Sequence, residues 1–129
     1  MAKPARILVV DDEADLVETI RFRLEQEGHQ VLTAVDGLQG LATARSEQPD
    51  LIVLDVMMPR LGGQDVLRAL RRSSATAGTP VIMATALGGD DATGEILVEA
   101  DAYIRKPYDL AVLIDEIDRI DRGRPALPT

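Results

Sequence analysis

The stretch "RILVVDDEADL", Arg6 to Leu16, joins a run of branched apolar residues to three consecutive acids. A continuous apolar run of this length is typical of a strand that is buried on both faces of a parallel sheet. Like charges that lie close together repel one another, and partial burial makes each carboxylate harder to ionise. The acids at the end of this run therefore indicate that a positive group lies among them in the folded protein.

Short apolar runs rich in β-branched residues recur along the chain, and residues at helical spacing separate them. The alternation predicts an α/β fold of five β-α repeats, with a five-stranded parallel sheet, doubly wound, and right-handed crossovers. The expected strands are Ile7 to Val10, Val31 to Val35 at an edge of the sheet, Leu51 to Leu54, Val81 to Ala84 and Ala102 to Ile104. The helical patterns are Leu16, Ile20 and Leu24; Leu38, Leu41 and Ala42; Val66, Leu67 and Leu70; and Leu110, Leu113, Ile114 and Ile117.

The chain of 129 residues fits one domain, which we expect to span residues 1–122. Gly28 is expected to cap the first helix at its C-terminus. Leu87 to Val98, which contains three glycines, predicts a short and mobile fourth helix. Residues 123–129 show no periodicity and are expected to be a disordered tail or the start of a linker.

Composition excludes several classes of protein. The chain is 46% hydrophobic and 28% charged, and its apolar runs are too short to cross a bilayer, so we expect a soluble protein without a membrane partner. It lacks cysteine and an apparent secretion signal, which suits the cytoplasm. A net charge of -8 disfavours direct binding of nucleic acid and favours cations or basic partner surfaces.

Five polar residues stand at the carboxyl ends of predicted strands, where open parallel sheets collect ligands. They are Asp11, Asp12, Asp55, Thr85 and Lys106. Each has an ordinary structural explanation, because an acid can cap a helix, a threonine suits a strand and a lysine can be solvated. Their joint occurrence at the ends of neighbouring strands favours a shared site.

The chemistry of these residues is coherent. Asp11, Asp12 and Asp55 supply hard oxygen ligands suited to Mg²⁺, and Lys106 adds a compact positive charge. A cation and a lysine that converge on one carboxylate give the charge neutralisation and positioning that phosphoryl transfer requires. The Lys106–Pro107 bond is a candidate cis peptide. Glu13 is interpreted as a helix-start charge outside the site.

The motifs "ILVVDDE", "DLIVLDVMMPRLGGQDVL", "VIMATA" and "DAYIRKPY" occur in this order, and from about Arg6 to Arg122 the chain closely resembles the receiver domain of bacterial two-component response regulators. The resemblance implies a flavodoxin-like receiver fold. It further implies that the chain acts on no substrate beyond its own phosphorylation and dephosphorylation, and so is not an enzyme in the usual sense.

The resemblance assigns roles to individual residues. Asp55 would be the phosphoacceptor, attacking a phosphohistidine on a sensor histidine kinase or phosphotransfer protein. Asp12, Asp55 and the backbone carbonyl of Met57 would hold Mg²⁺, with an indirect contact from Asp11. Lys106 would pair with the phosphoryl group.

The resemblance also implies a switch. Thr85 would donate a hydrogen bond to the phosphoryl group and shift, and Tyr103 would move inward behind it. Phosphorylation adds about -1.5 to -2 charges, which can bias a bistable loop in this way. Glu99 replaces the glycine usual in the family, which leaves the turn after the fourth helix open. Met57 and Leu87 are apolar where other members carry polar groups, which predicts a long-lived acyl phosphate.

Other functions remain as alternatives. A phosphatase with an aspartyl nucleophile would want a second acid at the position of Met57, and a nucleotide-binding P-loop motif is absent. A receiver that binds partners without phosphorylation is a third reading. The acidic segment "DLAVLIDEIDRIDR", 109–122, favours a downstream protein partner, and we expect a monomer or weak homodimer. The chain is either a stand-alone regulator or the excised receiver of a longer regulator with a DNA-binding or enzymatic output domain.

Overall fold

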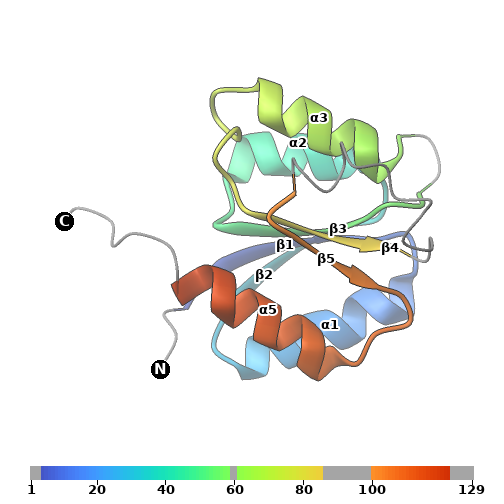
Figure 1. Ribbon diagram of the computed structural model, residues 1–129, viewed down its shortest axis with the longest axis vertical. Helices are drawn as coiled ribbons and strands as arrows, with labels where there is room; N and C mark the ends of the chain where they lie inside the picture. Colours follow the sequence, from blue (N-terminus) through green and yellow to red (C-terminus); the bar gives the residue numbers. More distant parts are fainter. Residues whose placement is uncertain (1–3, 59–60, 86–99, 123–129) are drawn as a thin grey trace.

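The computed structural model describes residues 4–58, 61–85 and 100–122. Five parallel strands form one sheet in the order β2-β1-β3-β4-β5 (Figure 1). Each strand begins and ends within one residue of its predicted position, and the predicted edge position of β2 is confirmed. The strands are β1 Arg6–Val10, β2 Gln30–Ala34, β3 Leu51–Asp55, β4 Val81–Thr85 and β5 Ala102–Arg105.

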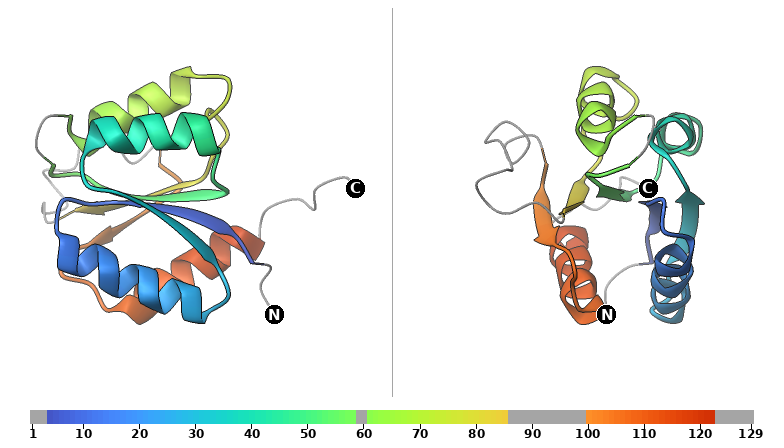
Figure 2. Two further views of the ribbon diagram at one scale, coloured as in Figure 1. Left: turned by 180° about the vertical axis from the view of Figure 1, so that it is seen from behind. Right: turned by 90° about the vertical axis from the view of Figure 1, so that its right-hand side faces the viewer.

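Helices cover both faces of the sheet, as predicted. Helices α1 (Ala14–Gln26) and α5 (Leu110–Arg122) lie on one face, and α2 (Gly37–Glu47) and α3 (Gly63–Arg72) lie on the other (Figure 2). Within the described ranges, none of the helices is long and apolar enough to span a membrane. The helix expected within 87–98 and the tail expected at 123–129 lie outside the described residues.

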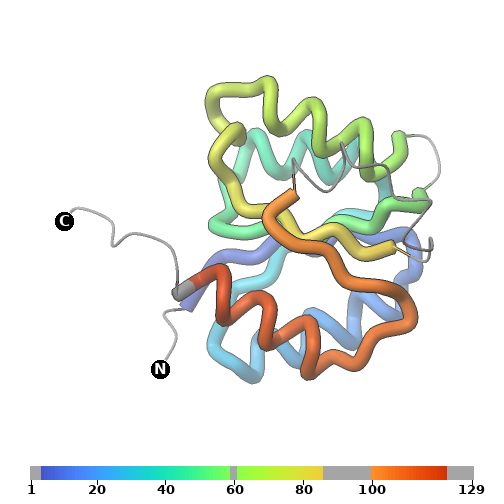
Figure 3. Tube along the Cα trace, viewed as in Figure 1, coloured from blue at the N-terminus to red at the C-terminus, as the bar shows by residue number. Residues whose placement is uncertain are grey.

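The core has two layers because successive side chains of a strand point to opposite faces of the sheet. In β1, Ile7 and Val9 pack with the α1 and α5 side, whereas Leu8 and Val10 pack with the α2 and α3 side. All four are at most 1% exposed. The chain trace in Figure 3 shows the strands of the sheet running in the same direction, so their carboxyl ends share one edge.

The turn between α1 and β2 confirms one expectation and adds a contact. Gly28 has φ +94°, a left-handed conformation that favours glycine, and it follows the end of α1 as predicted. His29, to which the sequence assigned no role, is buried, and its Nδ1 accepts a hydrogen bond from Ala5 N–H at 3.0 Å. Gln30 N–H donates to the Ala5 carbonyl at 2.9 Å. The imidazole therefore extends the pairing of β1 and β2 by one residue.

The buried face of α2 differs from the apolar pattern in its sequence. Leu38 is 56% exposed, and the residues that α2 buries are Gly37, Gly40 and Ala44. The physical reason is a close approach of the helix to the sheet, because a Cβ at Gly40 would lie 2.8 Å from Cγ1 of Val10. A side chain does not fit at Gly37 or Gly40, whereas Leu41, one of the predicted apolar positions, is partly buried against this layer and Leu38 points away from it.

Two leucines on the same side of the sheet test this description of the core. Leu70 on α3 is fully buried and Leu38 on α2 is largely exposed. We expect Leu70→Ala to lower the free energy of unfolding by about 2–5 kcal/mol, because it removes buried methyl groups and leaves a cavity. Leu38→Ala should change it by less than about 0.5 kcal/mol. Urea denaturation of both variants measures the difference, and equal losses would contradict the assigned face of α2.

Candidate phosphoryl-transfer site

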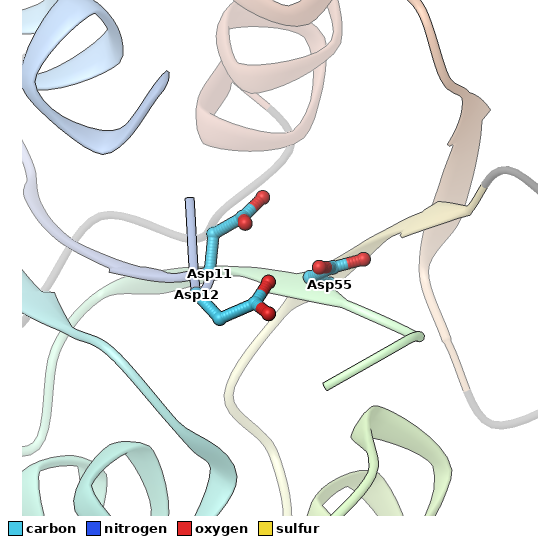
Figure 4. A group of neighbouring side chains, drawn as sticks. All are labelled: Asp11, Asp12 and Asp55. Atoms are coloured by element: carbon cyan, nitrogen blue, oxygen red, sulfur yellow. The ribbon is translucent and has the colours of Figure 1, made fainter. Parts of the chain in front are cut away.

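Three carboxylates meet at the carboxyl edge of the sheet. Asp11 and Asp12 follow β1, and Asp55 is the last residue of the neighbouring strand β3 (Figure 4). One carboxylate oxygen from each lies within 4.8 Å of the others. Asp11 and Asp55 are each 3% exposed, whereas Asp12 is exposed to solvent. The predicted clustering of these acids is confirmed, because parallel pairing places the ends of β1 and β3 side by side.

Both carboxylate oxygens of Asp11 are engaged by the protein. Oδ1 accepts a hydrogen bond from the backbone N–H of Glu13 at 2.9 Å, and Oδ2 accepts one from Nζ of Lys106 at 2.8 Å. Neither of these two contacts is made by Asp12, which is exposed to solvent beside the other acids (Figure 4). The two adjacent acids therefore differ in what they can offer, since Asp12 is the more accessible ligand.

Lys106 supplies the positive charge that the first acids indicated. It follows β5, its side chain is 14% exposed, and its ammonium lies 2.8 Å from Asp11 and 3.4 Å from Asp55. Its ammonium also lies 3.5 Å from a carboxylate oxygen of Glu13. The interpretation of Glu13 as a helix-start charge alone is therefore incomplete. Glu13 holds the N-cap position of α1 without a side-chain cap, and its side chain turns to the lysine instead.

One lysine does not balance the acids around it. Burial and the charge of Asp11 raise the pKa of Asp55 to about 6, although Lys106 and the Met57 N–H oppose this shift. Burial lowers the pKa of Lys106, but the carboxylates of Asp11 and Asp55 outweigh it and hold that pKa above its ordinary value. The lysine is thus firmly charged, and the ionised form of Asp55 is disfavoured mainly by burial and further by the charge of Asp11.

The remaining predicted residues occupy different positions. Thr85 ends β4, is 3% exposed, and its carbonyl accepts a hydrogen bond from Lys106 N–H at 2.7 Å. Met57 N–H donates to Oδ1 of Asp55 at 3.2 Å, and the Met57 side chain is 58% exposed. Tyr103, in the middle of β5, is 42% exposed. Met57 therefore contacts the acid cluster through its N–H, Thr85 contacts the backbone of Lys106, and Tyr103 stands on the exposed side of its strand.

A cavity of about 350 Å³ opens beside the lysine. Its lining residues are Glu13, Leu16, Lys106, Pro107 and Tyr108. The Lys106–Pro107 peptide bond that forms part of it is cis, as the sequence allowed. Burial raises the pKa of Tyr108 to about 12. Sequence reasoning missed this cavity, because the apolar spacing of Leu16 marked it only as a core position of α1.

The arrangement fits a hard divalent cation. Its donors are carboxylate oxygens, two of the three acids are buried, and a cation would oppose the burial and the Asp11 charge that together raise the pKa of Asp55. The Lys106 ammonium lies 3.4 Å from a carboxylate oxygen of Asp55 and 2.8 Å from one of Asp11. A carboxylate that lies near both a cation site and an ammonium group has surroundings suited to phosphoryl transfer, since both positive charges can stabilise the added oxygens.

Comparison with known proteins agrees with this chemistry. The family profile of the response regulator receiver domain matches residues 7–118. The chain is 39% identical over 124 residues to the DNA-binding dual master transcriptional regulator RpaA of Synechocystis, covering 95% of this chain and 52% of that protein. It is 37% identical over 122 residues to the protein PilH of Pseudomonas aeruginosa, covering 92% of this chain and 99% of PilH.

A solved structure extends the likeness to three dimensions. The response regulator TrrA from Thermotoga maritima, in complex with Mg²⁺ and BeF, superposes with a TM-score of 0.80 at 30% identity. The match covers 89% of this chain and 97% of TrrA. The chain spans about half the length of RpaA but nearly all of PilH. From the family profile, the relatives and the shared fold, we conclude that the chain belongs to the family of response regulator receiver domains.

Proposed function

We propose that the chain is a phosphoryl-accepting signalling switch in which Asp55 takes a phosphoryl group from the phosphohistidine of a sensor histidine kinase or phosphotransfer protein. The observation that carries this proposal is the convergence of Lys106 and the acids Asp11 and Asp12 on the buried carboxylate of Asp55. A bound cation would oppose the burial and the Asp11 charge that raise the pKa of Asp55, and so favour the ionised, nucleophilic form of this carboxylate at neutral pH.

The donor set suggests how Mg²⁺ would be held. Asp12 and Asp55 would ligate it directly, together with the backbone carbonyl of Met57. Asp11 would contribute through an intervening water, because both of its oxygens already accept hydrogen bonds from the protein. When bound, Mg²⁺ would neutralise the charge that builds up between the carboxylate and the phosphoryl oxygens.

The transfer exchanges one bond to phosphorus for another. A carboxylate oxygen of Asp55 attacks the phosphorus atom, the P–N bond to the donor imidazole breaks, and its electron pair stays on the departing nitrogen. Lys106, whose ammonium lies 3.4 Å from the Asp55 carboxylate, would pair with a phosphoryl oxygen. Hydrolysis of the resulting acyl phosphate returns the carboxylate, so the protein acts on its own phosphorylation rather than on a separate substrate.

Phosphorylation of Asp55 would change the conformation of the protein through Thr85 and Tyr103. The Thr85 hydroxyl donates a hydrogen bond to the new phosphoryl group, and Tyr103 moves from its 42% exposed position toward the space that Thr85 vacates. Thr85 and Lys106 are already joined by a backbone hydrogen bond of 2.7 Å, which couples the ends of β4 and β5. The residues between β4 and β5, at 86–99, lie outside the described ranges.

The output that fits best is a protein contact in the cytoplasm. On α5, Asp115 is exposed, and the net charge of -8 gives the domain no basic footprint for direct contact with nucleic acid. Residues 1–122 would form the receiver, as a monomer or weak homodimer. The near-complete match to PilH supports a stand-alone regulator, and the partial match to RpaA supports an excised receiver domain of a longer regulator.

A small phosphodonor tests the phosphoacceptor. On incubation with acetyl phosphate and Mg²⁺, the wild-type protein should gain the mass of one phosphoryl group, because its own residues supply the nucleophile and the positioning charges. Asp55→Asn should gain none. Asp65→Asn removes an exposed acid of α3 and should gain as much as wild type. Intact-mass spectrometry reads the result, and full labelling of Asp55→Asn would place the phosphoacceptor elsewhere.

The raised pKa of Asp55 predicts a pH-dependent stability when metal is removed with EDTA. The folded protein keeps the Asp55 proton up to about pH 6, whereas the ordinary pKa is 3.8. Stability from this group is therefore present below about pH 4 and is lost as the pH rises through 6, by up to about 3 kcal/mol. Asp55→Asn lacks this loss, so in EDTA it should be more stable than wild type at pH 7.5 and should lose that advantage near pH 4.

Chemical denaturation at both pH values, with and without Mg²⁺, measures this effect. Millimolar Mg²⁺ should stabilise the wild type by mass action and Asp55→Asn much less, because the variant lacks a ligand. Two results would argue against the acid site. One is a wild-type protein that is more stable than Asp55→Asn at pH 7.5 in EDTA. The other is a wild-type free energy of unfolding that does not change when Mg²⁺ is added.

The lifetime of the acyl phosphate depends on what orients water beside it. The side chain of Met57 has no polar group that could position an attacking water. The acyl phosphate on Asp55 should therefore last well beyond seconds after excess phosphodonor is removed. Met57→Asn should shorten that lifetime by supplying an amide. Quenched time points analysed by mass spectrometry follow the decay, and wild-type decay within seconds would contradict the expected screening.

A further inference from the structure

Helix α2 begins at a well-defined place because its first residues hydrogen-bond one another reciprocally. The Asp36 carboxylate accepts from the Gln39 N–H at 2.8 Å, and the Gln39 side-chain oxygen accepts from the Val35 N–H at 2.8 Å. Such caps satisfy amides that a helix start otherwise leaves without a partner. Gly37, the first residue of α2, is therefore held in one position relative to the end of β2.

Gly37 lies against the loop that joins β3 to α3. A Cβ at this position would stand 2.1 Å from the carbonyl oxygen of Leu61 and 2.9 Å from Cγ2 of Val66. The φ of Gly37 is not in the left-handed region, so lack of space excludes a side chain here, not backbone conformation. Alanine is the better helix former, and glycine inside a helix needs another reason. Direct contact between the helix and the loop backbone supplies it.

The same loop ends at Gly63, the first residue of α3, which packs against the beginning of the loop. A Cβ at Gly63 would lie 2.2 Å from the carbonyl oxygen of Asp55, and the Gly63 N–H donates to the Val56 carbonyl at 3.0 Å. Leu61 comes only two residues before Gly63 in the chain. The loop that follows Asp55 therefore lies against the first residues of two helices, with Gly37 beside the Leu61 carbonyl and Gly63 beside the Asp55 carbonyl.

We infer that Gly37 is a positioning residue for the phosphoacceptor loop, so that helix α2, which provides no ligand, holds Asp55 and the Met57 carbonyl in the arrangement that binds the divalent cation. The inference rests on the proposed function. Close-packed interiors transmit a displacement rather than absorbing it. A methyl group at Gly37 must move either the capped helix or Leu61, and moving Leu61 shifts a loop that ends on the Asp55 carbonyl.

If Gly37 had a purely structural role, its replacement would lower stability without changing Mg²⁺ binding. Two other glycines serve as controls that distinguish this role from the positioning role. Gly40 lies on the same face of α2, and a Cβ there would meet the Val10 side chain at 2.8 Å, away from the loop. Gly62 lies in the loop itself, and its Cβ would be 3.7 Å from the Val56 carbonyl oxygen, an ordinary contact. Gly40→Ala controls for crowding of the helix, and Gly62→Ala controls for a methyl group in the loop.

The experiment compares Gly37→Ala, Gly40→Ala and Gly62→Ala with wild type at a temperature where each is folded. Titration calorimetry gives the Kd for Mg²⁺, and hydrogen exchange without metal reports on the amides of Met57 and Gly63. We expect Gly37→Ala to weaken Mg²⁺ binding about tenfold and to speed exchange at both amides. Gly40→Ala should lower the melting temperature with Kd and exchange unchanged, and Gly62→Ala should resemble wild type.

Gln39→Ala keeps the test decisive if Gly37→Ala does not fold, because it loosens the helix start by removing one exposed side-chain cap without a change in charge. It should weaken Mg²⁺ binding and speed exchange in the same direction by a smaller factor. Loss of stability with unchanged Kd and unchanged exchange at Met57 and Gly63 would overturn the inference. A wild-type protein that binds no Mg²⁺ would refute the proposed function instead. Hydrogen exchange at Met57 and Gly63 without metal would then test, without the Kd, whether Gly37 positions the loop.

Discussion

The ammonium of Lys106 is the contact on which the carboxyl edge of the sheet depends. It lies 2.8 Å from Asp11 and 3.4 Å from Asp55, and these two carboxylates, each 3% exposed, come from adjacent strands. An unpaired buried charge costs several kcal/mol, which is comparable to the whole net stability of a domain. The lysine must therefore reach the acids from β5, and one ammonium still leaves Asp55 short of positive charge. That shortage links the fold to the proposed binding of a cation and a phosphoryl group.

The rest of the molecule offsets the unfavourable charges. All five residues of β3 and of β4 are buried, with apolar layers on both faces of the sheet. Each of these strands is paired with a neighbour on both sides, and this fixes the positions of Asp55 and Thr85 along the sheet. Burial of apolar surface is the main favourable term in folding, so the core can sustain a small cluster of acids that would not hold together alone. The buried charges and the proposed function are thus concentrated at one edge of the sheet.

Small residues give the other side of the site its shape. Gly37, Gly40 and Gly63 let the backbones of α2 and α3 approach β1 and the loop after β3 more closely than any side chain permits. Glycine destabilises a helix, so Gly37 and Gly40 lower the helix propensity of α2, but they allow it to pack closely against β1 and the loop after β3. The consequence is that Leu38, the largest residue of the first turn, faces solvent. A helix that looks poorly amphipathic in sequence can therefore be closely packed in the fold.

The sequence by itself determined the order of the elements, the strands to within one residue, and the meeting of Asp11, Asp12, Asp55 and Lys106. The reason is that apolar periodicity is local, and the carboxyl ends of parallel strands share an edge whatever their side chains are. Only the tertiary structure decided which face α2 buries, that Glu13 contacts Lys106, and that His29 accepts a hydrogen bond from Ala5. These features depend on distances between elements far apart in the chain, and such distances follow from packing rather than from local pattern.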